Sequence, residues 1–191
     1  MTNRLLHGVC AAILISALQT FTIGYLLSDH SNALHDGAEL RLKVFAQDPR
    51  SLLLGHYLRI TTPISHVAID RITGTWPKQG EFRPLYLRIF PDPNGAASIS
   101  EASFAPMTAE TGSVILKSEP LAMPDNPSQS EHLAIRYGIE KVYVPENLGT
   151  ELGAALADGS LSLIVTVSPQ GKAQIRQLLV KDRPVFTAPE F

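Results

Sequence analysis

LSLIVTVSPQGKAQIRQLLVK, residues 161–181, contains two apolar runs separated by a short turn. Leu161–Val167 and Ala173–Lys181 have the length and composition of strands, and Ser168-Pro169-Gln170-Gly171 between them is rich in turn-forming residues. Two such runs joined by a few turn residues predict a β-hairpin. We therefore expect a sheet-containing domain with two adjacent antiparallel strands near the end of the chain.

Further strands are predicted upstream of this hairpin. In AELRLKVFA, residues 38–46, Leu40, Leu42 and Val44 alternate with mostly polar side chains, which is the pattern of a half-buried strand. Other strand-like runs are residues 57–62, 83–90, 112–117, 132–138 and 141–144. Residues 91–131 are rich in Pro, Ser, Ala, Asn and Gly, and we expect long loops there, interrupted only by the strand at 112–117.

One helix is expected in the folded domain, over Asn147–Ala157. Its apolar positions follow a helical spacing, Asn147 is the expected N-cap, and Gly159 is the expected stop. Short, mostly antiparallel strands with one helix predict a β-rich α+β fold, a small barrel or a sandwich closed at one end by the helix.

Composition limits the functions that the chain can perform. The 191 residues carry 16 basic and 18 acidic side chains, a net charge of -2, without the clustered basic face that nucleic-acid binding requires. Cys10 is the only cysteine, which excludes an internal disulfide and a multi-cysteine zinc site. His30 and His35 lack the spacing of zinc ligands, and no phosphate-binding loop is present. We predict no nucleic-acid partner, no metal and no cofactor.

The N-terminal region has the properties of a membrane anchor. Residues 9–27, VCAAILISALQTFTIGYLL, contain no charged side chain, and as a helix they would extend about 28 Å against a hydrocarbon core of roughly 30 Å. Hydroxyls in this run can bond back to helix carbonyls. Arg4 precedes the run and Asp29, Asp36 and Glu39 follow it, which predicts an N-terminus in the cytoplasm.

The predicted organisation is a cytoplasmic stretch over residues 1–8, a transmembrane anchor over 9–27, a tether over 28–37 and an extracytoplasmic domain over 38–191. A cleaved signal peptide is the alternative, because Ser31-Asn32-Ala33 loosely resembles a cleavage site. We favour the retained anchor, since the apolar run is longer than a signal-peptide core of about 7 to 15 residues.

DPRSLLLGHY, residues 48–57, concentrates polar and special residues between two predicted strands. Asp48 before Pro49 is a helix-start signal and Gly55 a stop signal, so one interpretation is a helical turn with only a structural role. The other interpretation is a binding site at the corner between the two strands, because the side chains there would lie near one another. These are Asp48, Arg50, His56 and Tyr57.

A second motif, YGIEKVYVPE, occupies residues 137–146. The Tyr137-Gly138 step predicts a bulge or turn in a strand, for which glycine supplies a conformation that other residues resist. Glu140 and Glu146 could pair with Arg50, which would join the two motifs into one polar cluster. The candidate binding residues are Asp48, Arg50, His56, Tyr57, Tyr137, Glu140 and Glu146; no catalytic residue is identified.

The two motifs together resemble the GDYXXLXY family of bacterial membrane-anchored proteins. LKVFAQDPRSLLLGHYLRITT resembles the family's DPR and GDY element, and YGIEKVYVPE resembles a segment found later in members. His56 stands at the family's aspartate position, Ile60 at its leucine and Thr62 at its last tyrosine. The missing aspartate favours a structural or binding role over catalysis. The resemblance implies one N-terminal span and an outer domain, often beside a multi-span membrane protein, and it supplies no biochemical function.

These observations lead to two hypotheses. The first is a non-enzymatic, single-pass protein of the bacterial cytoplasmic membrane, in contact with lipid through residues 9–27. Its periplasmic or extracellular domain would bind an envelope or membrane protein, such as one with several spans. The alternative is a membrane-tethered enzyme or small-ligand binder that uses Asp48, Arg50, Tyr57 and Glu140 around a pocket. A closed polar cleft would favour the alternative.

Overall fold

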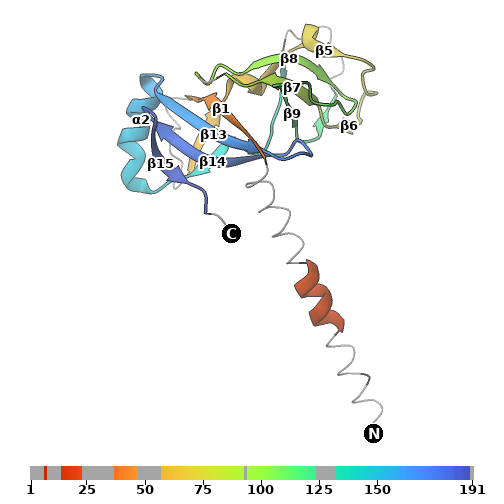
Figure 1. The fold of residues 1–191 in the computed structure, drawn as a ribbon, viewed down its shortest axis with the longest axis horizontal. Coiled ribbons are helices and arrows are strands. Elements are labelled where there is room, and N and C mark those ends of the chain that lie inside the picture. Colours follow the sequence, from red (N-terminus) through yellow and green to blue (C-terminus); the bar gives the residue numbers. More distant parts are fainter. Residues whose placement is uncertain are drawn as a thin grey trace.

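The fold is taken from a computed structural model of the chain, which describes His7 and residues 14–22, 37–46, 57–92, 94–123 and 132–189. Most of the predicted tether and residues 48–56 of the first motif, with the helical turn expected there, lie outside the described residues. Figure 1 shows a β-rich body in which a sheet of long strands lies beside a second sheet of shorter strands.

The predicted hairpin forms the centre of the largest sheet. Its strands are β1 (Ala38–Lys43), β13 (Leu161–Val167), β14 (Ala173–Val180) and β15 (Arg183–Thr187), in the order β1-β13-β14-β15, all antiparallel (Figure 1). Leu40 pairs with Val165 and Leu42 with Leu163, and all four side chains are fully buried. The alternation read in residues 38–46 and the hairpin are therefore confirmed.

The outermost strand of this sheet, β15, was not predicted. It contains Pro184, which lies opposite Leu179 next to a register shift between Leu178 and Leu179. Proline cannot donate a backbone hydrogen bond and is confined to edge strands or bulges, so its presence obscures the strand in the sequence.

A single predicted strand, residues 38–46, is shared between two sheets. After β1 the chain passes Val44, whose N–H donates to the Leu161 carbonyl oxygen at 3.1 Å, and enters β2 (Phe45–Ala46). β2 pairs with β3 (Tyr57–Thr61), which pairs on its other side with β12 (Lys141–Tyr143). This three-stranded sheet, in the order β12-β3-β2, brings the two sequence motifs together.

The second four-stranded sheet has the order β5-β8-β7-β9 (Figure 1). Its strands are β5 (Ile72–Thr73), β8 (Ser98–Ser103), β7 (Tyr86–Phe90) and β9 (Val114–Lys117). The β5–β8 pairing is parallel, whereas the other two pairings are antiparallel. β8 lies in the region predicted as loop, so that prediction was wrong there. SISEAS consists mainly of small or polar residues, and β8 is held by β5 and β7 on its two sides.

The remaining strands form two short ladders. β10 (Leu121–Ala122) pairs with β6 (Phe82–Arg83), and β11 (His132–Ala134) pairs with β4 (His66–Ala68). Short 3-10 turns are η1 (Pro63–Ser65), η2 (Ile69–Arg71) and η4 (Glu146–Leu148). The predicted β-rich, mostly antiparallel character is confirmed. Within the described ranges the strands form separate sheets rather than a closed barrel, so the barrel alternative was wrong.

The predicted helix is present as α2 (Gly149–Ala157), with Leu152 and Ala155 buried. It begins later than predicted: Asn147 lies in η4, and the N-cap is Leu148, which makes no side-chain capping bond. Gly159 ends it with a φ of 70°, as the sequence predicted. The N–H of Ser160 donates to the Ala155 carbonyl at 2.9 Å, which is the hydrogen bond of a Schellman ending.

Residues 14–22 are helical and lie apart from the β-rich body in Figure 1. They cover part of the predicted 9–27 anchor. Among the residues that the structure describes, no helix combines the length and the apolar character needed to cross a bilayer.

The turn of the central hairpin packs against the second sheet. Gly171 has a φ of 84°, and its carbonyl oxygen accepts a hydrogen bond from the Lys117 N–H of β9 at 2.7 Å. A Cβ at position 171 would lie 3.1 Å from both the Ile115 carbonyl oxygen and the Lys117 Cβ. Only glycine therefore fits the turn in both conformation and space.

We expect Gly171→Ala to lower the free energy of unfolding by about 1–3 kcal/mol, because it adds strain and a close contact at once. Gly153→Ala, in α2 with nothing within 4 Å of the added Cβ, is the matched control and should raise stability by about 0.5–1 kcal/mol. Urea unfolding of both variants measures the difference. Equal effects of the two substitutions would contradict the assigned role of Gly171.

Candidate functional site

The structure describes four of the seven candidate binding residues. Asp48, Arg50 and His56 lie outside the described residues, so the proposed pairing of Arg50 with the two glutamates stays a prediction. Tyr57 begins β3 opposite Tyr143 of β12, and Glu146 begins η4; for these two only the backbone is described. Tyr137 and Glu140 lie together in the connection between β11 and β12.

The predicted turn at Tyr137-Gly138 is present and is closed by Glu140. Gly138 has a φ of 82°, the left-handed conformation that favours glycine. One Glu140 carboxylate oxygen accepts the Tyr137 N–H at 2.7 Å, and the other accepts the Gly138 N–H at 3.1 Å. Both oxygens of this carboxylate therefore have backbone partners inside the turn.

Tyr137 fixes this turn to the segment that follows the first motif. Its side chain is buried, and its hydroxyl donates to the Ile64 carbonyl oxygen at 2.7 Å. Burial raises the pKa of the Tyr137 hydroxyl above its ordinary value, and the nearby Glu140 charge raises it further. The phenol is thus held neutral and serves as a hydrogen-bond donor.

The same two chain segments enclose a groove of about 370 Å³. At one end the Ile60 N–H donates to the Glu140 carbonyl oxygen at 3.0 Å, and at the other the Ile135 N–H donates to the Ser65 carbonyl oxygen at 2.9 Å. The lining residues are Arg59, Ile60, Thr61, Ser65, His66, Ala134, Ile135, Arg136, Glu140 and Lys141. The groove is thus built from chain segments next to both motifs, and its surface is partly polar and partly apolar.

The chain turn beside the groove is also well fixed. Thr62 precedes η1 and Ser65 is its last residue; both are buried, and the Ser65 hydroxyl oxygen accepts the Thr62 N–H at 3.1 Å. The two hydroxyl oxygens lie 3.1 Å apart, within hydrogen-bonding distance. Thr62 occupies the position at which the family pattern has its last tyrosine, and here it contributes to a buried cap rather than to a surface.

Sequence reasoning missed the cations of this groove. Arg59 lies in the first motif strand, and Lys141 follows Glu140 in the second motif, yet neither was selected because the backbone register between β3 and β12 was not known. The register makes Arg59 and Lys141 direct cross-strand partners. Their alternation with the buried Leu58 and Val142 was the available signal that both point to the exposed face.

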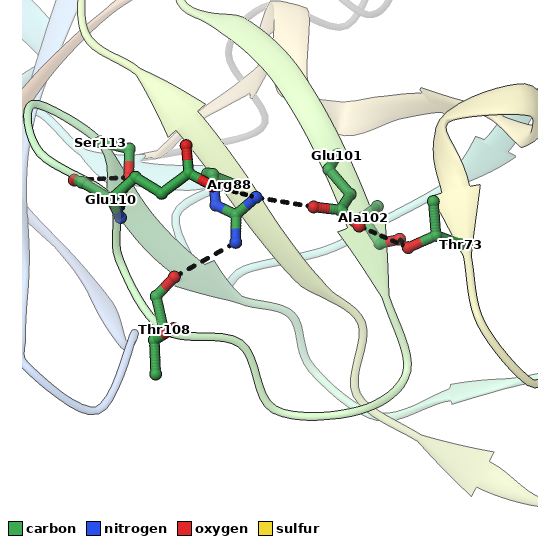
Figure 2. Close-up of polar contacts among 7 residues, drawn as sticks. All are labelled: Thr73, Arg88, Glu101, Ala102, Thr108, Glu110 and Ser113. Atoms are coloured by element: carbon green, nitrogen blue, oxygen red, sulfur yellow. Dashed lines mark hydrogen bonds and ion pairs between the residues drawn. The ribbon is translucent and has the colours of Figure 1, made fainter.

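A second polar cluster lies in the other four-stranded sheet. Figure 2 shows Arg88 of β7 between Glu101 of β8 and Glu110, with a further contact to the Thr108 carbonyl. The Arg88 Nη1 atom lies 2.7 Å from a Glu101 oxygen and 2.9 Å from a Glu110 oxygen. The Arg88 side chain is 14% exposed, so two carboxylates compensate a largely buried charge. This cluster secures the loop after β8, and the two carboxylates occupy the Arg88 guanidinium.

Metal binding finds no support in the described ranges. They contain no group of three or more His, Cys, Asp or Glu side chains placed to hold a metal ion.

Comparison with known proteins identifies the family. The model of the GDYXXLXY protein family matches residues 19–178, which is well over half of the chain. This chain therefore belongs to the GDYXXLXY protein family. No curated protein and no solved structure matches it.

We expect Tyr137→Phe to lower the free energy of unfolding by about 1–2 kcal/mol near neutral pH, because the buried Ile64 carbonyl loses its donor. Tyr143→Phe, at a side chain that is 69% exposed, is the matched control and should change the free energy of unfolding little.

The pH dependence of the stability difference between the wild type and Tyr137→Phe is an independent test of the role of Tyr137. Because folding raises the Tyr137 pKa, the unfolded chain releases this proton above about pH 10 while the folded chain keeps it. Wild-type stability should therefore fall more steeply above about pH 10 than that of Tyr137→Phe, and the gap between them should narrow. Parallel curves in urea unfolding would show that Tyr137 is not held neutral by the fold.

Proposed function

We propose that this GDYXXLXY family member is a membrane-anchored, non-enzymatic binding protein whose β-rich domain lies outside the cytoplasmic membrane. The observation that carries the proposal is the helix of residues 14–22. Leu14, Ile15, Leu18 and Phe21 are 58–73% exposed on it, and no charged side chain occurs anywhere in residues 9–27. An uncharged helix with large exposed apolar side chains is better solvated by lipid than by water.

The polar side chains of this helix support the same conclusion. The Thr20 hydroxyl donates to the Ser16 carbonyl oxygen at 2.9 Å, and the Thr22 hydroxyl donates to the Leu18 carbonyl oxygen at 2.8 Å. In a bilayer every polar group needs a partner within the protein, and these two hydroxyls have one in their own helix. Arg4 before the run and the acidic residues after it favour a cytoplasmic N-terminus.

Exposed aromatic side chains on the outer domain support a protein partner. Phe45 of β2, Phe82 of β6 and Tyr143 of β12 are 51%, 70% and 69% exposed. Aromatic residues are enriched in the parts of protein interfaces that contribute most to binding. Phe45 and Tyr143 lie on the two outer strands of the motif-containing sheet, which makes that sheet a suitable docking face for an envelope or membrane protein.

The geometry of the second motif favours binding over catalysis. Both Glu140 carboxylate oxygens accept backbone N–H groups, and the Tyr137 hydroxyl is buried and bonded to Ile64. Groups occupied in this way hold the turn and are poorly placed to transfer protons to a substrate. The ligand-binding alternative would use the groove beside them.

Cysteine labelling tests the anchor and its orientation, because Cys10 is the only native cysteine. We expect Lys78→Cys, at an exposed position, to react with a membrane-impermeant maleimide on intact spheroplasts. Thr2→Cys should react only after lysis, and the mass of the isolated protein should show that residues 1–36 are retained. Labelling of position 78 only after lysis would overturn the orientation, and a mass that lacks Cys10 would overturn the anchor.

The partner is tested by purification of the intact chain from membranes in mild detergent. We expect a membrane protein to elute with the chain at constant stoichiometry. Phe82→Ser and Tyr143→Ser each remove an exposed aromatic side chain and should weaken that association. Co-expression of tagged and untagged copies is the control for self-association. Elution of the chain alone, or with only its own copies, would contradict the proposed role.

A further inference from the structure

We propose that the open edge of β14 at residues 172–175 binds an extended segment of another polypeptide, which joins the large sheet as an added strand. β15 covers the same edge of β14 only from Gln177 to Val180, and the Ala188 N–H adds one bond to the Arg176 carbonyl oxygen at 2.8 Å. Beyond this point the edge faces a cleft of about 570 Å³. The inference rests on the partner role proposed above and names where and how that partner is bound.

The register of the central hairpin shows which backbone groups point into this cleft. The Ser168 N–H donates to the Lys172 carbonyl oxygen at 2.9 Å, so these two residues form a hydrogen-bonded pair. In an antiparallel ladder such pairs alternate with residues whose N–H and C=O groups point to the opposite side. Gln174 therefore bonds to β13, whereas Ala173 and Ile175 direct their N–H and C=O groups away from β13.

These outward groups are available for pairing. In the described part of the chain, neither Ala173 nor Ile175 makes a backbone hydrogen bond to a residue outside the strands, and both residues line the cleft. An unpaired strand edge is a template for a further strand, whose main chain supplies the affinity. Donor and acceptor groups two residues apart match the repeat of an extended polypeptide and not that of a helix.

The edge lacks the features that commonly prevent strand addition, which are prolines, charged side chains or a covering segment. Residues 173–175 are Ala, Gln and Ile, with neither a proline nor a charge. β9, the last strand of the second sheet, is by contrast covered by the hairpin turn through the bond from Lys117 to Gly171. Residues 173–175 are thus open to an added strand.

The facing wall of the cleft is held in place by hydrogen bonds. It is formed by four residues from the connections after β9 and β11, Ser118, Glu119, Tyr137 and Gly138. The Glu119 N–H donates to the Arg136 carbonyl oxygen at 2.7 Å, and the Tyr137 hydroxyl donates to the Ile64 carbonyl oxygen. Gly138 adds no side chain to the cleft. A preorganised wall lowers the entropic cost of ordering a bound segment.

The position of the edge favours a partner that lies close to the membrane. Ala38, the first residue of β1, pairs with Val167, and Val167 pairs with Ala173, so the open edge lies at the end of the sheet where β1 begins (Figure 1). The predicted tether, residues 28–37, would extend at most about 35 Å from the predicted anchor. Outer segments of a neighbouring membrane protein are within this reach, and we assign the bound strand to such a protein.

The first test is a display selection with short random peptides that contain no disulfide, performed on the full chain in a non-ionic detergent. We expect recovery of peptides that bind saturably. Amide hydrogen exchange, followed residue by residue, should then slow by about tenfold or more at Ala173 and Ile175, because both N–H groups gain an acceptor. Gln174, which already bonds to β13, is the internal control and should change by about twofold at most.

Proline substitutions provide a second test with the same peptides. Ala173→Pro and Ile175→Pro each remove one outward N–H and should weaken peptide binding by about tenfold or more. Thr187→Pro is the matched control, because the Thr187 N–H points to the outer side of β15, away from β14, and Thr187 does not line the cleft. Circular dichroism identifies any variant that does not fold, and the other variant and the hydrogen exchange of the wild type then decide.

Three results would overturn the proposal. The first is a selection that yields no binding peptide, and the second is protection of amides other than those of Ala173 and Ile175. The third is recovery of peptides only with a chain that ends at Ala188, which would assign the cleft to the chain's own C-terminal segment. Peptide binding at this edge in a chain that elutes from membranes alone would contradict the membrane-protein partner and leave the strand-binding edge supported.

Discussion

The backbone hydrogen bond from Lys117 to Gly171 connects the two larger sheets, and much of the architecture depends on it. The same hairpin forms the centre of one sheet through β13 and β14 and contacts the other through its turn. A side chain at position 171 would meet the backbone of β9, so the sheets approach this closely only where the Cβ atom is absent. The leucines of β1 and β13 are buried, and this burial stabilises the sheet that contains the hairpin.

Local sequence patterns predicted those strands and turns that depend on residues close to them in the sequence. The β13–β14 hairpin, the alternation of Leu40, Leu42 and Val44, and the end of α2 at Gly159 could all be read from the chain. β8 could not, because SISEAS becomes a strand only when β7 and β5 lie on either side of it. The division of residues 38–46 between two sheets likewise results from a distant contact, the hydrogen bond of Val44 to Leu161.

The candidate site shows the same limit at the level of side chains. The glycine turn at Tyr137-Gly138 was predictable, since it needs only local backbone chemistry. The bond from the Tyr137 hydroxyl to Ile64 and the pairing of Arg59 with Lys141 were not, because each joins residues more than 70 positions apart. Motif reading selected chain segments that lie next to the groove, while the groove and its cations emerged only from the register of β3 and β12. The binding roles of Asp48, Arg50 and His56 in the first motif stay predictions.

Pro184 gives the β15 margin of the large sheet a further property. A strand at the end of a sheet presents unpaired backbone groups to any other chain that approaches it. In the described part of the chain, β15 is the last strand of its sheet, and Pro184 has no backbone N–H to donate to an added strand. Pro184 thus interrupts the row of hydrogen-bond donors along this border, which disfavours a regular added strand there.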